Sequence, residues 1–326
     1  MGAMQPIHGI VACVAGQRRR MIAPALLVVA ILAGCGAPAP TAEPASSSPT
    51  STEPVSLRPT TSPKPTPAPS PTLTAAPTLA PIVGATQTRC PGSVGTAHRG
   101  SMTTGQSRNW AGYVVGATRG HVTCVEGTWT QPKVSCPATS RTSVAIWVGI
   151  DGSSGVGSIP DSSATLAQTG TIADCSGGHA QYSAWYEFLP DLLQIEPFHL
   201  TIAAGDQIWA QVRWLGKGRF LATVINLTRR VGDTQTWSLR YAPLLTAEWI
   251  VEDPAASCSF NACTFVALAH FTTVTLNGAV TVSGAHYNLA AIPFPYLRTG
   301  ITRSGRTLAT PSSLTSHGFK VTWKAS

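Results

Sequence analysis

Charged residues are scarce in this chain: of its 326 residues, 22 are Lys or Arg and 14 are Asp or Glu. The basic surplus gives a net charge of +8 at pH 7, but it is small and scattered along the sequence. Proteins that bind nucleic acid concentrate positive charge on one face or in dense runs. We therefore expect no nucleic-acid partner.

Several catalytic signatures are also absent. The chain has no His-Glu-x-x-His motif, no Gly-x-Ser-x-Gly motif and no Gly-rich phosphate loop, which argues against a zinc peptidase, a serine hydrolase and a nucleotide enzyme. It lacks Asp-Thr-Gly and Asp-Ser-Gly as well, and Gln168-Thr169-Gly170 has an amide where an aspartic peptidase has its acid. Without a Cys-x-x-Cys pair or a His-containing ligand cluster, we expect no metal and no organic cofactor.

Amphipathic helices are missing after the first 34 residues. The pattern consists of short runs rich in β-branched and aromatic residues, punctuated by Gly and Pro, which favours an all-β sandwich or barrel. These runs cover residues 179–188, 207–214, 220–226, 236–241, 264–275 and 318–323.

The first 34 residues read as an export signal. They contain no acid, a basic cluster at Arg18-Arg19-Arg20 and a short apolar run that ends at Leu32-Ala33-Gly34-Cys35. The last four residues resemble a bacterial lipobox, in which the Cys is acylated, so Cys35 is a candidate lipid anchor to the cell membrane. A plain secretory signal with a chance cysteine is the alternative. Removal of residues 1–34 would lower the net charge from +8 to +5.

Residues 35–81 have the composition of a linker. Half of the chain's 26 prolines fall there, among Thr, Ser and Ala, and no hydrophobic period runs through the segment. Such a segment cannot bury a core and is expected to be an extended spacer. It would hold the remaining residues, 82–326, away from the membrane as one folded domain.

Six cysteines remain in that domain, an even number that suggests disulfides in an oxidising compartment. Six cysteines allow 15 pairings. Cys258 and Cys263 flank a loop of four residues and are the first pair that we expect. For the others we favour Cys136 with Cys175, which leaves Cys90 with Cys124.

The segment Ala247 to Asp253 reads as a buried strand that carries three carboxylates. Side chains on a strand alternate between faces, so Glu248 and Glu252 share one side with Ile250. Two acids beside apolar residues are costly to desolvate unless the strand has one wet face. The pattern leaves a wet face and a catalytic site as equal alternatives.

Five segments resemble, in order, the signature blocks of the glutamic peptidases (eqolisins). They are Asn109-Trp110-Ala111-Gly112, Trp147-Val148-Gly149-Ile150-Asp151-Gly152, Gln168-Thr169-Gly170, Ala184-Trp185-Tyr186-Glu187 and Ala247-Glu248-Trp249-Ile250-Val251-Glu252-Asp253. The resemblance implies a β-sandwich of two large, curved antiparallel sheets. It also implies hydrolysis of protein or peptide bonds at acid pH.

The resemblance assigns the general base to Glu248 and the oxyanion stabiliser to Gln168. A carboxylate can take a proton from water and return it to the leaving nitrogen, and an amide can donate a hydrogen bond to the oxyanion. From the pattern alone, Gln168 would be a loop residue whose amide makes local hydrogen bonds.

Five further residues are candidates for the substrate cleft or its support, and each has a plainer interpretation. Asp151 resembles an acid near the family's site, or forms a turn before Gly152. Glu187 lies in the fourth signature block, or on a wet sheet edge. Glu252 raises the pKa of Glu248 by like-charge repulsion, or faces solvent. Trp110 and Trp147 line the cleft, or belong to the core.

The sequence thus predicts an exported or lipid-anchored endopeptidase that acts outside the cytoplasm as a monomer. A surface module that binds carbohydrate or peptide without chemistry is the alternative from another class, and an inactive homologue is a third. Both Gln168 and Glu248 favour the enzyme, because a binding cleft needs neither. Fold alone does not decide, since sandwiches serve as enzymes and as lectins.

Overall fold

The computed structural model describes residues 82–95, 99–117, 121–156, 161–259 and 262–324, and of residues 258, 259 and 262 only the backbone. The predicted export signal, the candidate lipid-anchor residue Cys35 and the predicted linker up to residue 81 lie outside the described residues. In the described part, no helix is long and apolar enough to cross a membrane. Its one helical segment is the 3-10 turn η1 (Leu289–Ala291).

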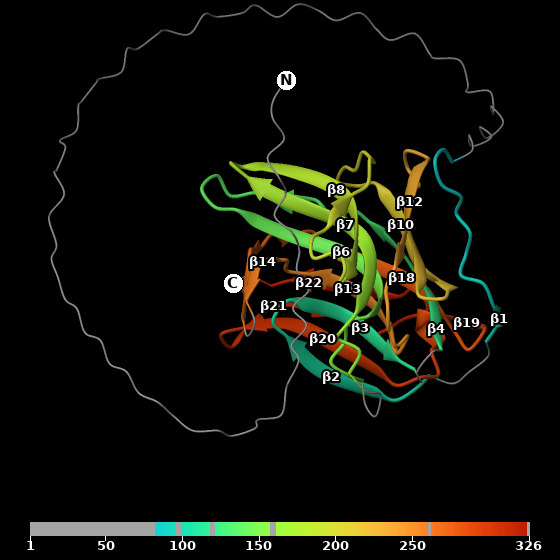
Figure 1. The fold of residues 1–326 in the computed structure, drawn as a ribbon. Coiled ribbons are helices and arrows are strands. Elements are labelled where there is room, and N and C mark those ends of the chain that lie inside the picture. The colour runs from blue at the N-terminus through green and yellow to red at the C-terminus, as the bar shows by residue number, and fades with distance from the viewer. Residues whose placement is uncertain (1–81, 96–98, 118–120, 157–160, 260–261, 325–326) are drawn as a thin grey trace, which may run out of the picture. The chain divides into compact units, whose positions relative to one another are not determined.

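The described residues form a β-sandwich (Figure 1). We name its layers after their central strands. The β13 sheet has the order β9 (Glu196–Pro197), β8 (His179–Leu189), β7 (Leu166–Ser176), β6 (Thr142–Asp151), β13 (Thr246–Glu252), β3 (Trp110–Gly116), β20 (Tyr296–Arg303) and β2 (Met102–Ser107). The β4 sheet has the order β12 (Val231–Ser238), β11 (Arg219–Asn226), β10 (Gln207–Gly216), β4 (Val122–Thr130) and β18 (Val274–Val282).

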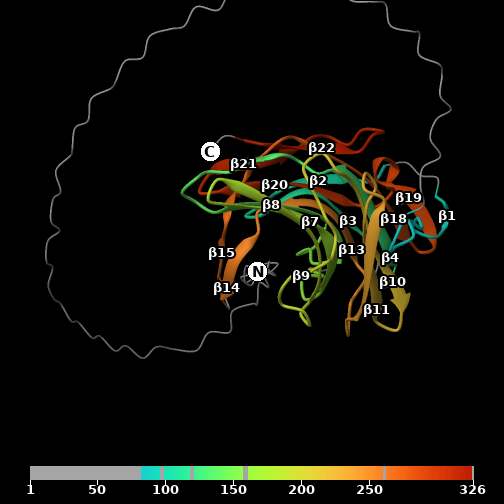
Figure 2. The same ribbon diagram turned by 90° about the horizontal axis from the view of Figure 1, so that it is seen from above.

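Short strands complete and connect the layers. Along β18 lie β19 (Ala285–Asn288) and β22 (Phe319–Trp323), with β1 (Ser93–Val94) beside β19. The two sheets are joined through β21 (Arg306–Pro311), which pairs with both β20 and β22. The remaining strands are β5 (Val134–Ser135), β14 (Ala255–Ser259), β15 (Ala262–Phe265), β16 (Ala267–Leu268) and β17 (His270–Phe271). Figure 2 shows the β14–β15 hairpin projecting away from the main sheets.

This architecture confirms the expected sandwich of large antiparallel sheets. Parallel pairing occurs between β2 and β20, β1 and β19, and β16 and β6. The run expected over residues 264–275 is wrong in detail, because its parts pair with different partners, β14, β6 and β5, as separate short strands. The strand expected over residues 236–241 begins earlier, at Val231, because the polar residues of β12 all pair with β11.

The β13 sheet is buried on both faces. One face packs against the β4 sheet in the main core, with Val148, Trp249 and Val251 among its members. The other face carries a second apolar cluster that includes Trp147, Trp185 and Ile250. Consequently every residue of β6 and β13 is buried, and any acid on these strands must be accommodated away from bulk water.

Two disulfides are described, Cys90–Cys124 and Cys136–Cys175, and both are the predicted pairings. Cys263 also forms a disulfide. Cys258 is its register partner across the β14–β15 hairpin, although the side chain of Cys258 lies outside the described residues.

Candidate functional site

The candidate catalytic pair lies in a single row across the β13 sheet. Glu248 of β13 is opposite Gly149 of β6, Gly149 is opposite Gln168 of β7, and Gln168 is opposite Glu187 of β8. Residues in register on adjacent strands point to the same face, so all of these side chains lie on the face away from the β4 sheet. The acid and the amide are thus two strand spacings apart, each of about 4.8 Å.

Gly149 separates the pair without a side chain of its own. A Cβ atom at this position would lie 2.9 Å from the ring of Trp147 and 3.0 Å from a methyl group of Leu166, so these two side chains pack over the glycine. The row therefore sets an acid and an amide on either side of a glycine, beneath an apolar cover.

Glu187 orients Gln168. The Nε2 of Gln168 donates a hydrogen bond of 2.6 Å to Oε2 of Glu187, and both side chains are fully buried. Among the described residues, Oε1 of Gln168 has no hydrogen-bond partner. Burial raises the pKa of Glu187 well above its ordinary value, while the bond from Gln168 lowers it and the charge of Glu252 raises it further. The amide is thus held by one N–H, with its second N–H and its carbonyl oxygen left for other partners.

Glu248 has the opposite environment. Neither of its carboxyl oxygens has a hydrogen-bond partner in the described part of the chain, and the side chain is fully buried. Burial raises the pKa of Glu248 well above its ordinary value; the nearby Thr246 hydroxyl lowers it, and the charge of Asp151 raises it. A buried polar group without a partner is unusual in a folded protein and marks a candidate site of function.

Asp151 fastens the strands that carry the site. It ends β6 with a φ of 68°, in the left-handed region, and accepts hydrogen bonds from the backbone N–H groups of Leu244 (3.0 Å) and Leu245 (2.7 Å). The Thr165 hydroxyl donates a third, longer hydrogen bond of 3.4 Å. Burial raises the pKa of Asp151 to about 6, and these hydrogen bonds limit the rise. The sequence-based role of Asp151 in positioning the catalytic residues stays a prediction, and its observed partners are the segments that precede β13 and β7.

Two sequence-based alternatives for Glu252 are corrected by the structure. Glu252 does not face solvent, because it is fully buried and accepts hydrogen bonds of 2.7 Å from Asn109 Nδ2 and from Trp147 Nε1. The acid whose charge raises the pKa of Glu248 is Asp151 instead. Burial raises the pKa of Glu252 to about 7, against the hydrogen bonds that it accepts.

The two candidate tryptophans lie next to this acid. Trp147 is fully buried, and Trp110, which is half-buried, packs edge-on against it with ring centroids 5.0 Å apart. Both belong to the apolar cluster on the site face, so they are cluster residues and neighbours of the acids at once. The alternative of a wet face for Glu187, Glu248 and Glu252 is wrong, since this cluster covers the face.

Sequence reasoning missed Asn109 and Gly149 as site residues. Each lies in a signature block, but only the strand register shows that Asn109 reaches Glu252 and that Gly149 separates the catalytic candidates. In the described residues, no group of three or more His, Cys, Asp and Glu side chains could hold a metal ion. The side chains of the row itself are carboxyl groups and one oriented amide.

Comparisons with known proteins point to one family. The model of the Peptidase A4 family matches residues 108–323. Among curated proteins, Aspergillopepsin-2 of Aspergillus niger is 32% identical over 202 residues, which cover 55% of this chain and 65% of the length of that relative. The chain thus spans less than two thirds of the curated relative that it matches.

Two solved structures share the fold. Scytalido-glutamic peptidase with a peptide-based transition-state analogue has a TM-score of 0.55, and SCP-B, an eqolisin in complex with the tripeptide Ala-Ile-His, has a TM-score of 0.53. Each match is 24% identical and covers 67% of this chain and 99% of the other. At this identity, the structures support a common sandwich and nothing finer.

The buried acids predict that the protein is more stable at acid pH than at neutral pH. The pKa of Asp151 rises from 3.8 to about 6 and that of Glu252 from 4.5 to about 7, so the folded state binds more protons than the unfolded chain between these values. The free energy of unfolding should fall as pH rises from about 4 to about 7, by about 3 kcal/mol for one such group at about 1.4 kcal/mol per pKa unit.

Urea unfolding at several pH values measures this slope. Glu252→Gln should flatten it, whatever its effect on stability at one pH, whereas Glu196→Gln in β9, a half-buried glutamate outside the row, should leave it unchanged. A stability that rises from pH 4 to pH 7 would contradict the assignment of protonated acids to the folded state.

Proposed function

Because the chain belongs to the Peptidase A4 family, we propose that it is an endopeptidase in which Glu248 is the general base and Gln168 stabilises the oxyanion. The observation that carries the proposal is the row Glu248, Gly149, Gln168 and Glu187 across four neighbouring strands. It sets an unpartnered acid and an oriented amide on either side of Gly149. Few structural roles need both, and a fully buried acid without a partner destabilises a fold that does not use it.

The proposed reaction needs only these two side chains and a water. The Glu248 carboxylate removes a proton from the water as its oxygen attacks the scissile carbonyl carbon. The carbonyl oxygen becomes an oxyanion, to which the free N–H of Gln168 donates a hydrogen bond. The protonated Glu248 then gives its proton to the leaving nitrogen as the C–N bond breaks, which restores the carboxylate. Neither side chain is consumed, and no covalent intermediate forms.

The surrounding acids support this pair in different ways. Glu187 accepts a hydrogen bond from one N–H of Gln168, which leaves the other N–H to donate to the oxyanion. Gln168 does not titrate, so the protonation state of Glu248 sets the acid limb of the rate. Since the pKa of Glu248 is raised above 4.5, that limb should lie at higher pH than for an exposed glutamate. The optimum at acid pH that the family resemblance implies would then be mildly rather than strongly acid.

The substrate we propose is a protein or peptide chain. Peptide and peptide-analogue complexes of the two solved relatives support this class, and the half-buried Trp110 at the edge of the apolar cluster offers a contact to an apolar side chain. The place of action that we propose is outside the cytoplasm, with the chain exported by residues 1–34 and held at the membrane by a lipid on Cys35. Support for that location is the sequence pattern of basic, apolar and lipobox residues.

Removal of either catalytic side chain should abolish hydrolysis while the fold is retained. Glu248→Gln keeps the shape of the side chain without a base and should lower kcat by about 10²- to 10⁴-fold. Gln168→Ala should lower it by about 10²- to 10³-fold. The measurement is cleavage of an unfolded protein by the purified protein from pH 3 to pH 8, with chelator and pepstatin present.

Glu196→Gln is the matched control and should keep full activity. Circular dichroism and thermal unfolding establish that each variant folds. Full activity in either catalytic variant would overturn the assignment. An inactive but well-folded wild type would favour the module that binds without chemistry.

A side chain at position 149 should act like removal of a catalytic group. Gly149→Ala places a methyl group between Glu248 and Gln168, against Trp147 and Leu166. We expect kcat/KM to fall by about 10²-fold because the water and the carbonyl lose their positions, with a stability cost of about 1–3 kcal/mol. Gly105→Ala in β2, where the Cβ would crowd only the Leu297 side chain, at 3.0 Å, is the control and should remain active. Wild-type kinetics for Gly149→Ala would argue against a reaction between Glu248 and Gln168.

A further inference from the structure

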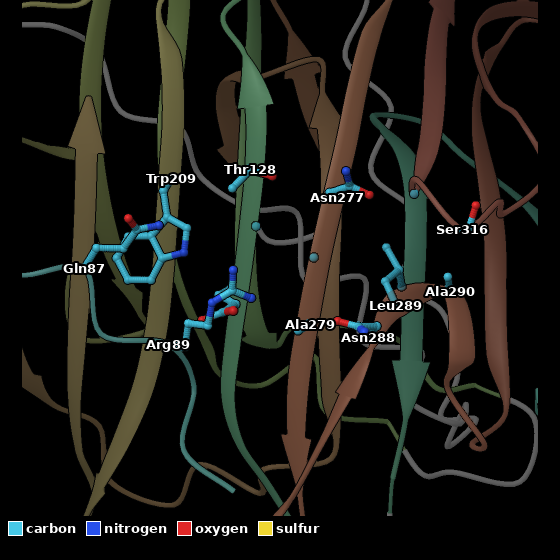
Figure 3. A pocket seen from close by; sticks show the side chains of 14 residues that line it. Gln87, Arg89, Thr128, Trp209, Asn277, Ala279, Asn288, Leu289, Ala290 and Ser316 are labelled. Carbon is cyan, nitrogen blue, oxygen red and sulfur yellow. The ribbon is translucent and has the colours of Figure 1, made fainter. Parts of the chain in front are cut away.

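A pocket lies on the outer surface of the β4 sheet, with a volume of about 310 Å³. Thr128 of β4 and Asn277 of β18 are register partners on its floor, and their side chains point away from the core. Figure 3 shows Gln87 and Arg89 on one side of them and Asn288 and Ser316 on the other. The walls therefore come from chain segments that are far apart in sequence.

Six polar side chains of this pocket take no part in holding the fold. Within the part of the chain that the structure describes, no hydrogen bond or ion pair engages the side chains of Gln87, Arg89, Thr128, Asn277, Asn288 and Ser316. Most of them are exposed, so their donors and acceptors face water. These polar groups converge around one pocket and are free to form hydrogen bonds with a ligand that has many hydroxyl groups.

One wall is fixed in place by strong local contacts. The Cys90–Cys124 disulfide ties the segment that carries Gln87 and Arg89 to β4, and the Cys90 N–H donates a 2.7 Å hydrogen bond to Glu126. Gln211 donates a 2.8 Å hydrogen bond to the Thr88 carbonyl. The wall is thus preorganised, which lowers the entropic cost of binding. It also precedes residue 108, so it lies outside the segment that matches the Peptidase A4 family.

The chemistry of the lining selects among ligands. Amide and hydroxyl side chains both donate and accept hydrogen bonds, which suits sugar hydroxyl groups. One cation, Arg89, and one carboxyl group, Glu126, leave the pocket without a strong charge of either sign. Large apolar side chains contribute little, since Trp209 is only 3% exposed and Leu289 only 1%. From these features we infer that the pocket binds a neutral saccharide, rather than an anionic polymer or an apolar peptide.

The saccharide site and the candidate catalytic row lie on opposite sides of the sandwich. Thr128 and Asn277 point outward from the β4 sheet, whereas Glu248 and Gln168 point outward from the β13 sheet, with the main core between the layers. A ligand in this pocket does not block the candidate catalytic row. Binding there would retain the protein on a polysaccharide while the other face remains free, so the two functions can be tested separately.

The test is isothermal titration of the purified protein with neutral tetrasaccharides: cellotetraose, xylotetraose, mannotetraose and chitotetraose. We expect at least one to bind, and Asn277→Ala and Arg89→Ala each to weaken that binding about tenfold, as the loss of one or two hydrogen bonds would. The matched controls are Gln235→Ala in β12 and Arg219→Ala in β11, exposed residues of the same sheet outside the pocket. They should bind as the wild type does.

Cleavage of an unfolded protein is measured in parallel and should be unchanged in all four variants. A failure of the peptidase proposal can then be told apart from a failure of the saccharide proposal. The saccharide site is overturned if no tetrasaccharide binds with a Kd of about 10 mM or lower, which is the weak end of specific recognition. It is equally overturned if binding survives both pocket variants, or if peptide binds there and displaces the sugar.

Discussion

The absence of a cationic partner for the acids on the site face of the β13 sheet is the constraint on which the rest of the site depends. Asp151, Glu187, Glu248 and Glu252 are buried, and none forms a salt bridge in the described part of the chain. Burial therefore raises the pKa of each. Three of them accept hydrogen bonds that limit the cost of burial, from backbone N–H groups, from an amide or from an indole. Glu248 accepts none that the described residues show, so the cost of burial and the capacity to act on a water belong to the same residue.

The two-layer fold creates this situation. In an ordinary sandwich, one face of each sheet packs in the core and the other meets water, so acids on the outer face cost little. Here a second apolar cluster covers the outer face of the β13 sheet. The same residues that exclude water also orient the acids, since Trp147 belongs to that cluster and donates a hydrogen bond to Glu252. The site is therefore part of the packing of the sheet rather than an addition at its edge.

Much of this could be predicted from the sequence, and the remainder depends on register. Alternation along residues 247–253 correctly placed Glu248 and Glu252 on one face, and the signature blocks correctly indicated a sandwich. A single strand does not reveal which residue of the next strand lies opposite, so the position of Gly149 between Glu248 and Gln168 could not be read from the chain. Nor could the partner of Glu252, because Asn109 is 143 residues away in sequence. Burial of the acids was missed for a related reason: the cluster that covers them is assembled from strands β3, β6, β7, β8 and β13.

The most direct test is a crystal structure of the protein with a peptide phosphinate, whose tetrahedral phosphorus carries two oxygens in place of the attacking water and the oxyanion. The account predicts that the phosphinate lies over Gly149, with one oxygen within hydrogen-bond distance of the Glu248 carboxyl group and the other within that distance of Gln168 Nε2. The bond from Gln168 to Glu187 should be retained. A phosphinate bound to one of these side chains without the other, or bound on another face of the sandwich, would contradict the pairing of acid and amide across the glycine.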